Sequence, residues 1–108
     1  MLDELDDAAL DALPFGVVCL DEGMKVLRMN RTESEKSGIQ RWRALGRDYF
    51  RDVAPGPTNR TLAEHVAAFA QRGAPAKLSH VFHRRAGADA TQIELRKEAN
   101  RVYLVIRR

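Results

Sequence analysis

Glu33 is the carboxylate in this 108-residue sequence with the greatest capacity for specific chemistry. It follows Asn30 by three residues, which is the spacing of a helix-capping pair. If Glu33 instead lies buried against Met29 and Phe50, the loss of hydration raises its pKa, and the protonated carboxyl can bind the hydroxyl of a ligand. The sequence leaves both interpretations open, a helix start and a ligand-binding acid.

The remaining reactive side chains do not form a catalytic or metal-binding set. Cys19 is the only cysteine, which excludes an intrachain disulfide framework and a multi-cysteine zinc site. His80 and His83 fall on opposite faces of a predicted strand, so they cannot easily share a metal ion. The sequence contains no glycine-rich phosphate loop and no serine or cysteine with a credible base and orienting acid. We therefore expect no enzymatic activity and no metal site.

A cluster of basic and aromatic residues suggests a second kind of chemistry, the binding of nucleic acid. The cluster contains four arginines and two aromatic residues, namely Arg41, Arg43, Arg47, Arg51, Trp42 and Tyr49. However, no helix-turn-helix pattern accompanies it, and an acidic N-terminal segment offsets the basic charge. We therefore favour a solvated basic face or a surface for an acidic partner over a nucleic-acid site.

Length and charge define the class of protein. A chain of 108 residues forms one domain, and 44% hydrophobic with 31% charged residues is typical of a folded chain. Residues 1–13 hold five acids and no base, whereas residues 14–108 hold 18 bases and ten acids, a net charge of +8. The sequence has no apolar run long enough for a membrane-spanning helix. The acidic start is unlike a secretory signal or a transit peptide, so we expect a cytoplasmic protein.

The N-terminal half predicts a helix, a hairpin and several short helices. Leu2, Leu5, Ala9 and Leu13 share one face of a helix over residues 2–13, which Pro14 ends. So short a helix is marginal alone, and its apolar stripe must dock on another surface. Residues 15–20 and 25–30 form strands around a turn that contains Gly23. Residues 30–53 are helical, with breaks at Gly38 and Gly46.

The C-terminal half predicts one longer helix and three strands. Residues 54–59 form a loop because two prolines flank a glycine, and the amphipathic helix that follows ends at Gly73 and Pro75. Strands are expected over residues 77–84, 91–96 and 101–107, with a turn at residues 86–89. The last strand is apolar on both faces, so we place it in the centre of the sheet. This order of elements predicts an α+β fold with one antiparallel sheet.

Two stretches resemble a known family. Residues 10–21 (LDALPFGVVCLD) and 44–55 (ALGRDYFRDVAP) are similar to the PAS domains of the photoactive yellow protein type. The resemblance implies a five-stranded antiparallel sheet with short helices on one face. It also implies a PAS domain over residues 14–108, preceded by residues 1–13 as an amphipathic N-terminal helix.

The same resemblance implies a site without the family's covalent chromophore. The family's cysteine, which holds a coumaroyl group as a thioester, corresponds to Gly56, so no coumaroyl chromophore is expected. Met29 and Ile39 replace the family's tyrosine and arginine, whereas Glu33 is retained and Ser37 replaces a threonine. The expected ligand pocket therefore contains Met29, Glu33, Ser37, Phe50 and Gly56. Some PAS domains bind haem through a helical histidine, but His65 alone is a weak signal, so no haem is expected.

Together these features predict a non-photoactive PAS sensor that transmits a signal through a protein partner. A small-molecule ligand in the pocket is compatible with this prediction. We also expect a homodimer, with Leu2, Leu5, Ala9 and Leu13 in contact with the sheet or with a second subunit. Two alternatives stay open: a purely structural oligomerisation domain without ligand, and a nucleic-acid-associated regulator that uses the arginine-rich face.

Overall fold

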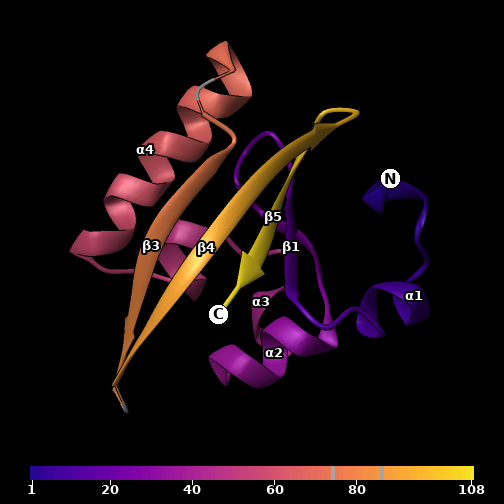
Figure 1. Ribbon diagram of the computed structural model, residues 1–108, viewed down its shortest axis with the longest axis horizontal. Coiled ribbons are helices and arrows are strands. Elements are labelled where there is room, and N and C mark those ends of the chain that lie inside the picture. Colours follow the sequence, from indigo (N-terminus) through magenta and orange to yellow (C-terminus); the bar gives the residue numbers. More distant parts are fainter. Residues whose placement is uncertain (74, 86) are drawn as a thin grey trace.

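The protein is built on one five-stranded antiparallel sheet (Figure 1). The computed structural model describes residues 1–73, 75–85 and 87–108. The strands lie side by side in the order β2-β1-β5-β4-β3. The predicted α+β class and five-stranded PAS sheet are therefore confirmed. The strands are β1 (Gly16–Leu20), β2 (Val26–Met29), β3 (Lys77–Arg84), β4 (Gly87–Glu98) and β5 (Arg101–Arg107).

Strand β5 is the centre of the sheet, as its apolar pattern predicted. It pairs with β1 on one side and with β4 on the other. All five residues from Val102 to Ile106 are buried. Val102, Leu104 and Ile106 face an inner core, whereas Tyr103 and Val105 face an outer core. Both faces of the sheet are therefore covered.

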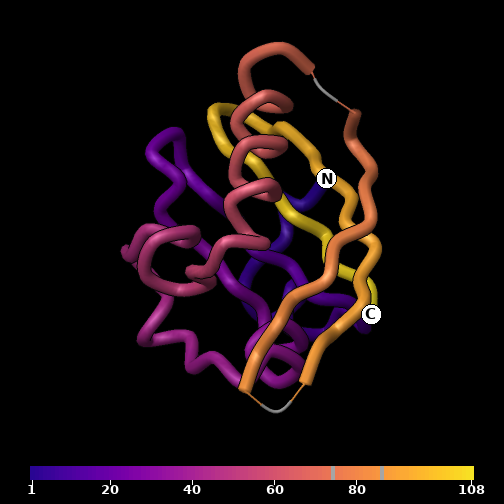
Figure 2. Tube along the Cα trace, turned by 90° about the vertical axis from the view of Figure 1, so that its left-hand side faces the viewer, coloured from indigo at the N-terminus to yellow at the C-terminus, as the bar shows by residue number. Residues whose placement is uncertain are grey.

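Helices cover the inner face. They are α2 (Arg31–Ser37), α3 (Arg41–Ala44), the π-helical turn η2 (Tyr49–Val53) and α4 (Pro57–Arg72). Figure 2 shows α4 running alongside the strands, and its Leu62 and Val66 lie in the inner core. Within the described residues, no helix combines the length and the apolar character that crossing a membrane requires.

The start of α4 corrects the loop predicted for residues 54–59. Pro57 does not block the helix but opens it, because the first turn needs no backbone N–H donor there. Gly56 precedes it as the N-cap with φ of 130°, a conformation that favours glycine. Gly73 ends α4 in the left-handed conformation, as predicted.

The segment before β1 covers the outer face, but it is not the single helix predicted over residues 2–13. Leu2–Glu4 forms a 3₁₀ turn (η1), and Asp7–Asp11 forms a short helix (α1). Asp6 separates the two, because its side chain caps α1 by accepting a hydrogen bond from the Ala9 amide at 2.8 Å. That cap holds the backbone of Asp6 extended, so the helix cannot continue through it.

The predicted apolar stripe packs on the sheet of its own chain. Leu2 is buried, and Leu5 and Leu13 pack half-buried against the outer core, while Ala9 is partly exposed. The Glu98 carboxylate in β4 accepts hydrogen bonds from the Leu2 and Asp3 amides at 3.2 and 2.8 Å. The stripe thus covers the sheet within one chain, and its role in a homodimer stays a prediction.

The β3–β4 hairpin is longer than predicted. Residues 87–89, expected in a turn, pair instead with β3 as the beginning of β4. Ala86, also placed in that turn, lies outside the described residues. Because β4 pairs with β5 only from Gln92 onward, residues 87–91 pair with β3 alone.

Asn30 joins three elements at the edge of the sheet. Its side-chain oxygen accepts hydrogen bonds from the amides of Val17 at 2.9 Å and Glu33 at 3.0 Å. Its amide group donates to the carbonyls of Leu10 at 2.8 Å and Phe15 at 3.0 Å. The predicted cap of α2 is therefore confirmed, and the same side chain also fixes the end of α1 and the entry to β1.

We expect Asn30→Ala to lower the free energy of unfolding by about 3–5 kcal/mol, because it leaves buried backbone groups without a hydrogen-bond partner and removes a helix cap. Urea denaturation monitored by circular dichroism measures this loss. Asn30→Asp, which keeps the acceptor but loses the donor, should be intermediate. Asn100→Ala, at an exposed turn, is the control and should change little. A loss for Asn30→Ala no larger than that of the control would contradict the assigned role.

Candidate functional site

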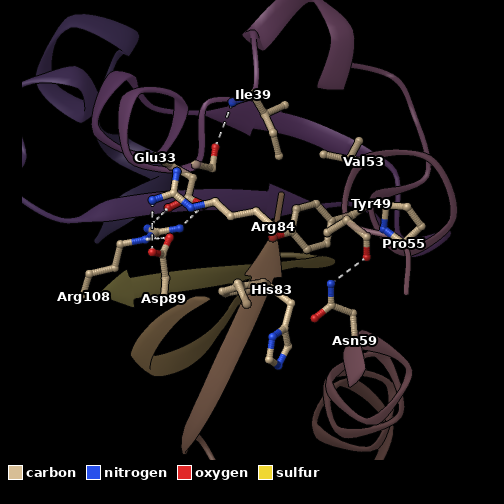
Figure 3. Close-up of a pocket in the computed structure, with 13 residues that line it drawn as sticks. Glu33, Ile39, Tyr49, Val53, Pro55, Asn59, His83, Arg84, Asp89 and Arg108 are labelled. Atoms are coloured by element: carbon tan, nitrogen blue, oxygen red, sulfur yellow. Dashed lines mark hydrogen bonds and ion pairs between the residues drawn. The ribbon is translucent and has the colours of Figure 1, made fainter. Parts of the chain in front are cut away.

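A cavity of about 220 Å³ lies between the segment that contains α2 and η2 and the β3–β4 hairpin (Figure 3). Its apolar walls come from Ile39, Val53, Ala54, Pro55 and Phe82. Charged side chains gather at one end, and Tyr49, Pro55 and Asn59 lie toward the other. The cavity therefore offers an apolar middle between two polar ends.

The charged end is a chain of four ion-paired side chains. Arg108 donates to both oxygens of Glu33, at 2.7 and 3.3 Å. Arg108 also donates to Asp89 at 3.2 Å, and Asp89 in turn accepts from Arg84 at 3.2 Å. Only 3% of the Glu33 side chain is exposed, against 46% for Arg84. The network therefore runs from the interior to the surface.

Burial raises the pKa of Glu33 above its ordinary value. The hydrogen bonds and positive charge of Arg108 oppose this effect without cancelling it, and the negative charge of Asp89 adds to it. Burial thus acts on the pKa of Glu33 in the direction expected of a buried carboxyl, although the charged groups around it are Arg108 and Asp89 and the expected neighbours were Met29 and Phe50.

Glu33 enters the cavity because β1 leaves space for it. A Cβ atom placed on Gly16 would collide with Oε1 of Glu33. The amide of Glu33 is capped by Asn30, while its carboxylate turns away from the helix start toward Arg108. The helix-cap interpretation holds for the backbone of Glu33, whereas its side chain pairs with Arg108, and the binding of a ligand hydroxyl by this carboxyl stays a prediction. Arg108 is 75 residues away, so no local pattern identified it.

Tyr49 supplies a polar group that sequence reasoning missed as a site residue. It is 2% exposed and lines the cavity, and its hydroxyl forms no hydrogen bond with the described residues. Burial strongly raises the pKa of Tyr49, and the charge of Glu33 raises it further. The phenol is therefore a neutral hydrogen-bond donor. Asn59, by contrast, is fixed by contacts with the carbonyl of Ala54 and with His80.

The structure brings together only two of the five predicted pocket residues. Glu33 and Ser37 line the cavity. Met29 is buried in the inner core, and Phe50 packs edge-on against Tyr49 with ring centroids 4.9 Å apart. Gly56 is exposed at the start of α4. These three residues do not line the cavity, because the local backbone directs them elsewhere. The neighbouring Pro55 lines it instead of Gly56.

The other candidate residues are engaged in ordinary contacts. His65 lies 2.7 Å from the carbonyl of Pro75 through Nε2. Cys19 is buried in the outer core, and burial raises the pKa of its thiol. Among the described residues, no group of three histidines, cysteines or carboxylates is placed to hold a metal ion.

Comparison with known proteins identifies the family. The family model described as "PAS fold" matches residues 10–103. Photoactive yellow protein from Rhodothalassium salexigens is 36% identical over 52 residues, which is 48% of this chain and 42% of that protein. The photoactive yellow protein of Rhodobacter capsulatus is 27% identical over 94 residues, covering 86% of this chain and 76% of that protein.

A solved structure agrees with these matches. The photoactive yellow protein domain of the sensor histidine kinase Ppr from Rhodospirillum centenum superposes with a TM-score of 0.89. It is 28% identical, and the match covers 98% of this chain and 96% of that one. The chain therefore belongs to the PAS family and is of the photoactive yellow protein type.

Proposed function

We propose that this PAS domain is a non-photoactive sensor that binds a small molecule without a covalent bond and signals through a protein partner. The observation that carries the proposal is the cavity of about 220 Å³, which combines an apolar middle with the Tyr49 hydroxyl, a donor that forms no hydrogen bond with the described residues. The described residues hold no fully buried side-chain nitrogen or oxygen without a hydrogen-bond partner, so the Tyr49 hydroxyl is open to the cavity space, where a ligand acceptor would gain a hydrogen bond.

The lining defines the chemical class of ligand. Ile39, Val53 and Phe82 favour a compact apolar body. Tyr49 donates a hydrogen bond at one end, and the Glu33–Arg108 pair lies at the other. A small aromatic or short aliphatic molecule with one hydroxyl or carboxyl group fits these requirements. Gly56 provides no nucleophile for a thioester, so the proposed binding is reversible, and the proposal assigns no catalytic residue.

Two other functions compete with this one. A structural oligomerisation domain would keep the cavity without a ligand and pair two copies through the segment before β1. A nucleic-acid regulator would use the arginine-rich face. Two members of the aromatic and basic cluster are not free to bind nucleic acid. Tyr49 is buried, and Arg41 forms a 2.9 Å ion pair with Asp11. Both observations weaken the nucleic-acid alternative.

Tyr49→Phe tests the ligand site. We expect its free energy of unfolding to stay within about 0.5 kcal/mol of the parent, because the lost hydroxyl has no partner to leave unpaired. A panel of small phenols and short-chain carboxylic acids is the probe, and the shift of the melting temperature is the readout. At least one compound should stabilise the parent protein, and that shift should shrink in Tyr49→Phe.

Tyr103→Phe is the matched control for this experiment. Its hydroxyl donates to Asp3 and accepts from Arg28 on the opposite face of the sheet. We expect this variant to lose stability but to keep the full ligand-induced shift. If no compound stabilises the parent, the structural alternative replaces the sensor.

The pH dependence of stability tests the buried carboxylate. The pKa of Glu33 is higher in the folded protein than in the unfolded chain. The contribution of Glu33 to the free energy of unfolding is therefore complete below its ordinary pKa of 4.5, and it is lost as the pH rises through the pKa of Glu33 in the folded protein. Glu33→Gln cannot titrate. The stability of the parent relative to Glu33→Gln should therefore fall as the pH increases above about 4.5, as measured by urea denaturation across a pH series.

Glu94→Gln gives the opposite slope and serves as the control. A hydrogen bond from Arg96 lowers the pKa of Glu94, so its contribution is present above 4.5 and is lost as the pH falls. If the stability of the parent relative to Glu33→Gln instead increases as the pH rises, the ion pair with Arg108 outweighs the effect of burial on Glu33.

A further inference from the structure

We infer that the surface around Trp42 is a docking site for an acidic, apolar-anchored segment of a partner protein. This inference deepens the proposed function, on which it rests, by naming the surface that receives the partner. The site is formed by Leu27 in β2, Trp42 in α3 and Leu45 after it, with Arg43 and Arg47 beside them. We call it the Trp42 surface.

The apolar side chains of the Trp42 surface are unusually exposed. Trp42 is 70% exposed, Leu45 is 45% exposed and Leu27 is 40% exposed. Leu27 and Leu45 are adjacent, because Val26 and Leu45 form a parallel bridge at the edge of the sheet. Exposed tryptophan and arginine side chains beside aliphatic ones are the composition of protein–protein binding sites.

A hollow beside this surface offers a place for one partner side chain. It has a volume of about 150 Å³. Its lining is apolar at Leu10, Leu27, Met29 and Leu45 and polar at Asp7, Asp11, Arg28 and Asn30, and Asp7 is paired with Arg28 at 3.3 Å. Arg41 also lines it, held by the 2.9 Å ion pair with Asp11. A leucine- or phenylalanine-sized anchor fits such a hollow, whose lining includes Arg41, the neighbour of Trp42 in the chain.

The charge selects an acidic partner. Arg43 and Arg47 are exposed and form no ion pair with the described residues. Arg43 stacks over the Trp42 ring with its guanidinium carbon 5.0 Å from the ring centroid. The carboxylates that line the hollow are already paired, Asp7 with Arg28 and Asp11 with Arg41. Arg43 and Arg47 therefore complement carboxylates of a partner that flank an apolar side chain.

The same observations disfavour two other occupants. A second copy meeting this surface by two-fold symmetry would place Arg43 and Arg47 against their own equivalents. A nucleic acid would make use of the arginines, but it would not explain three exposed apolar side chains and the hollow. A protein segment uses both the apolar and the charged parts of the site.

The backbone connects the Trp42 surface to the cavity. The chain leaves the cavity at Ile39, passes through the Trp42 surface, and returns to the cavity at Tyr49 and Val53. Between these points it is tied to the sheet edge, where the Val26 amide donates to the Arg47 carbonyl at 2.9 Å. A ligand that moves Ile39 or Tyr49 therefore acts on the two ends of the segment that displays Trp42.

Trp42 is the only tryptophan, so it reports on its own surface. The probe is a synthetic amphipathic helix with leucines on one face and glutamates on the other, added to the whole chain without a cavity ligand. We expect a shift of the indole N–H resonance and of the tryptophan emission. The counterpart peptide with lysines in place of glutamates should leave both unchanged. The double variant Arg43→Glu, Arg47→Glu should weaken binding about tenfold or more.

The matched control carries the same change of charge on α4, Arg60→Glu with Arg72→Glu, and should bind like the parent. Equal weakening in both double variants, or no indole shift with the acidic peptide, would overturn the inference. A Trp42 indole shift with duplex DNA and not with the peptide would assign the surface to nucleic acid. An indole shift caused only by raising the protein concentration would assign the surface to a second copy of the chain. Either result also overturns the inference. If the peptide binds but no compound of the phenol and carboxylic acid panel stabilises the protein, the sensor is rejected while the surface is retained.

Discussion

The burial of β5 on both faces is the constraint on which the rest of this structure depends. Five successive residues of that strand are buried, so neither face of the sheet can be left to solvent. The inner face is covered by α4 and the short helices, and the outer face by the segment before β1. Asn30 and Glu98 then fasten these covers with buried hydrogen bonds to backbone groups. The cavity arises on the inner face, where the covering helices meet the β3–β4 hairpin.

Within that frame, one missing side chain determines the character of the site. Gly16 leaves the space that the Glu33 carboxylate fills, and Arg108 compensates the charge that burial would otherwise disfavour. The carboxylate is therefore held in place by the protein itself. Among the described residues, the Tyr49 hydroxyl has no such partner. The proposed ligand site rests on this difference between a carboxylate that is paired within the protein and a hydroxyl that is open to the cavity.

Periodicity predicted the strands and the central place of β5, because burial on two faces leaves a continuous apolar run. It failed where one polar side chain determines the backbone conformation. At Asp6 the helix cap interrupts the helix that was predicted over residues 2–13. It also failed at Pro57, which begins a helix rather than ending one. In the site, local spacing identified Glu33 and the cap by Asn30. It could not identify Arg108 or Tyr49, since their roles depend on tertiary contacts. The family resemblance placed Met29, Phe50 and Gly56 in the pocket, and these three residues do not line the cavity.

The hairpin of β3 and β4 has a mechanical consequence for the cavity. Residues 87–91 have a hydrogen-bonded neighbour on one side only, and Arg84 and Asp89 of this overhang form part of the cavity wall. A two-stranded ribbon bends and twists more readily than the interior of a sheet. The wall formed by this overhang is therefore less constrained by hydrogen bonds to neighbouring strands than strands in the middle of the sheet are. Proposed ligands of different width would therefore displace the end of the β3–β4 hairpin before they disturb the pairing of β1, β5 and β4.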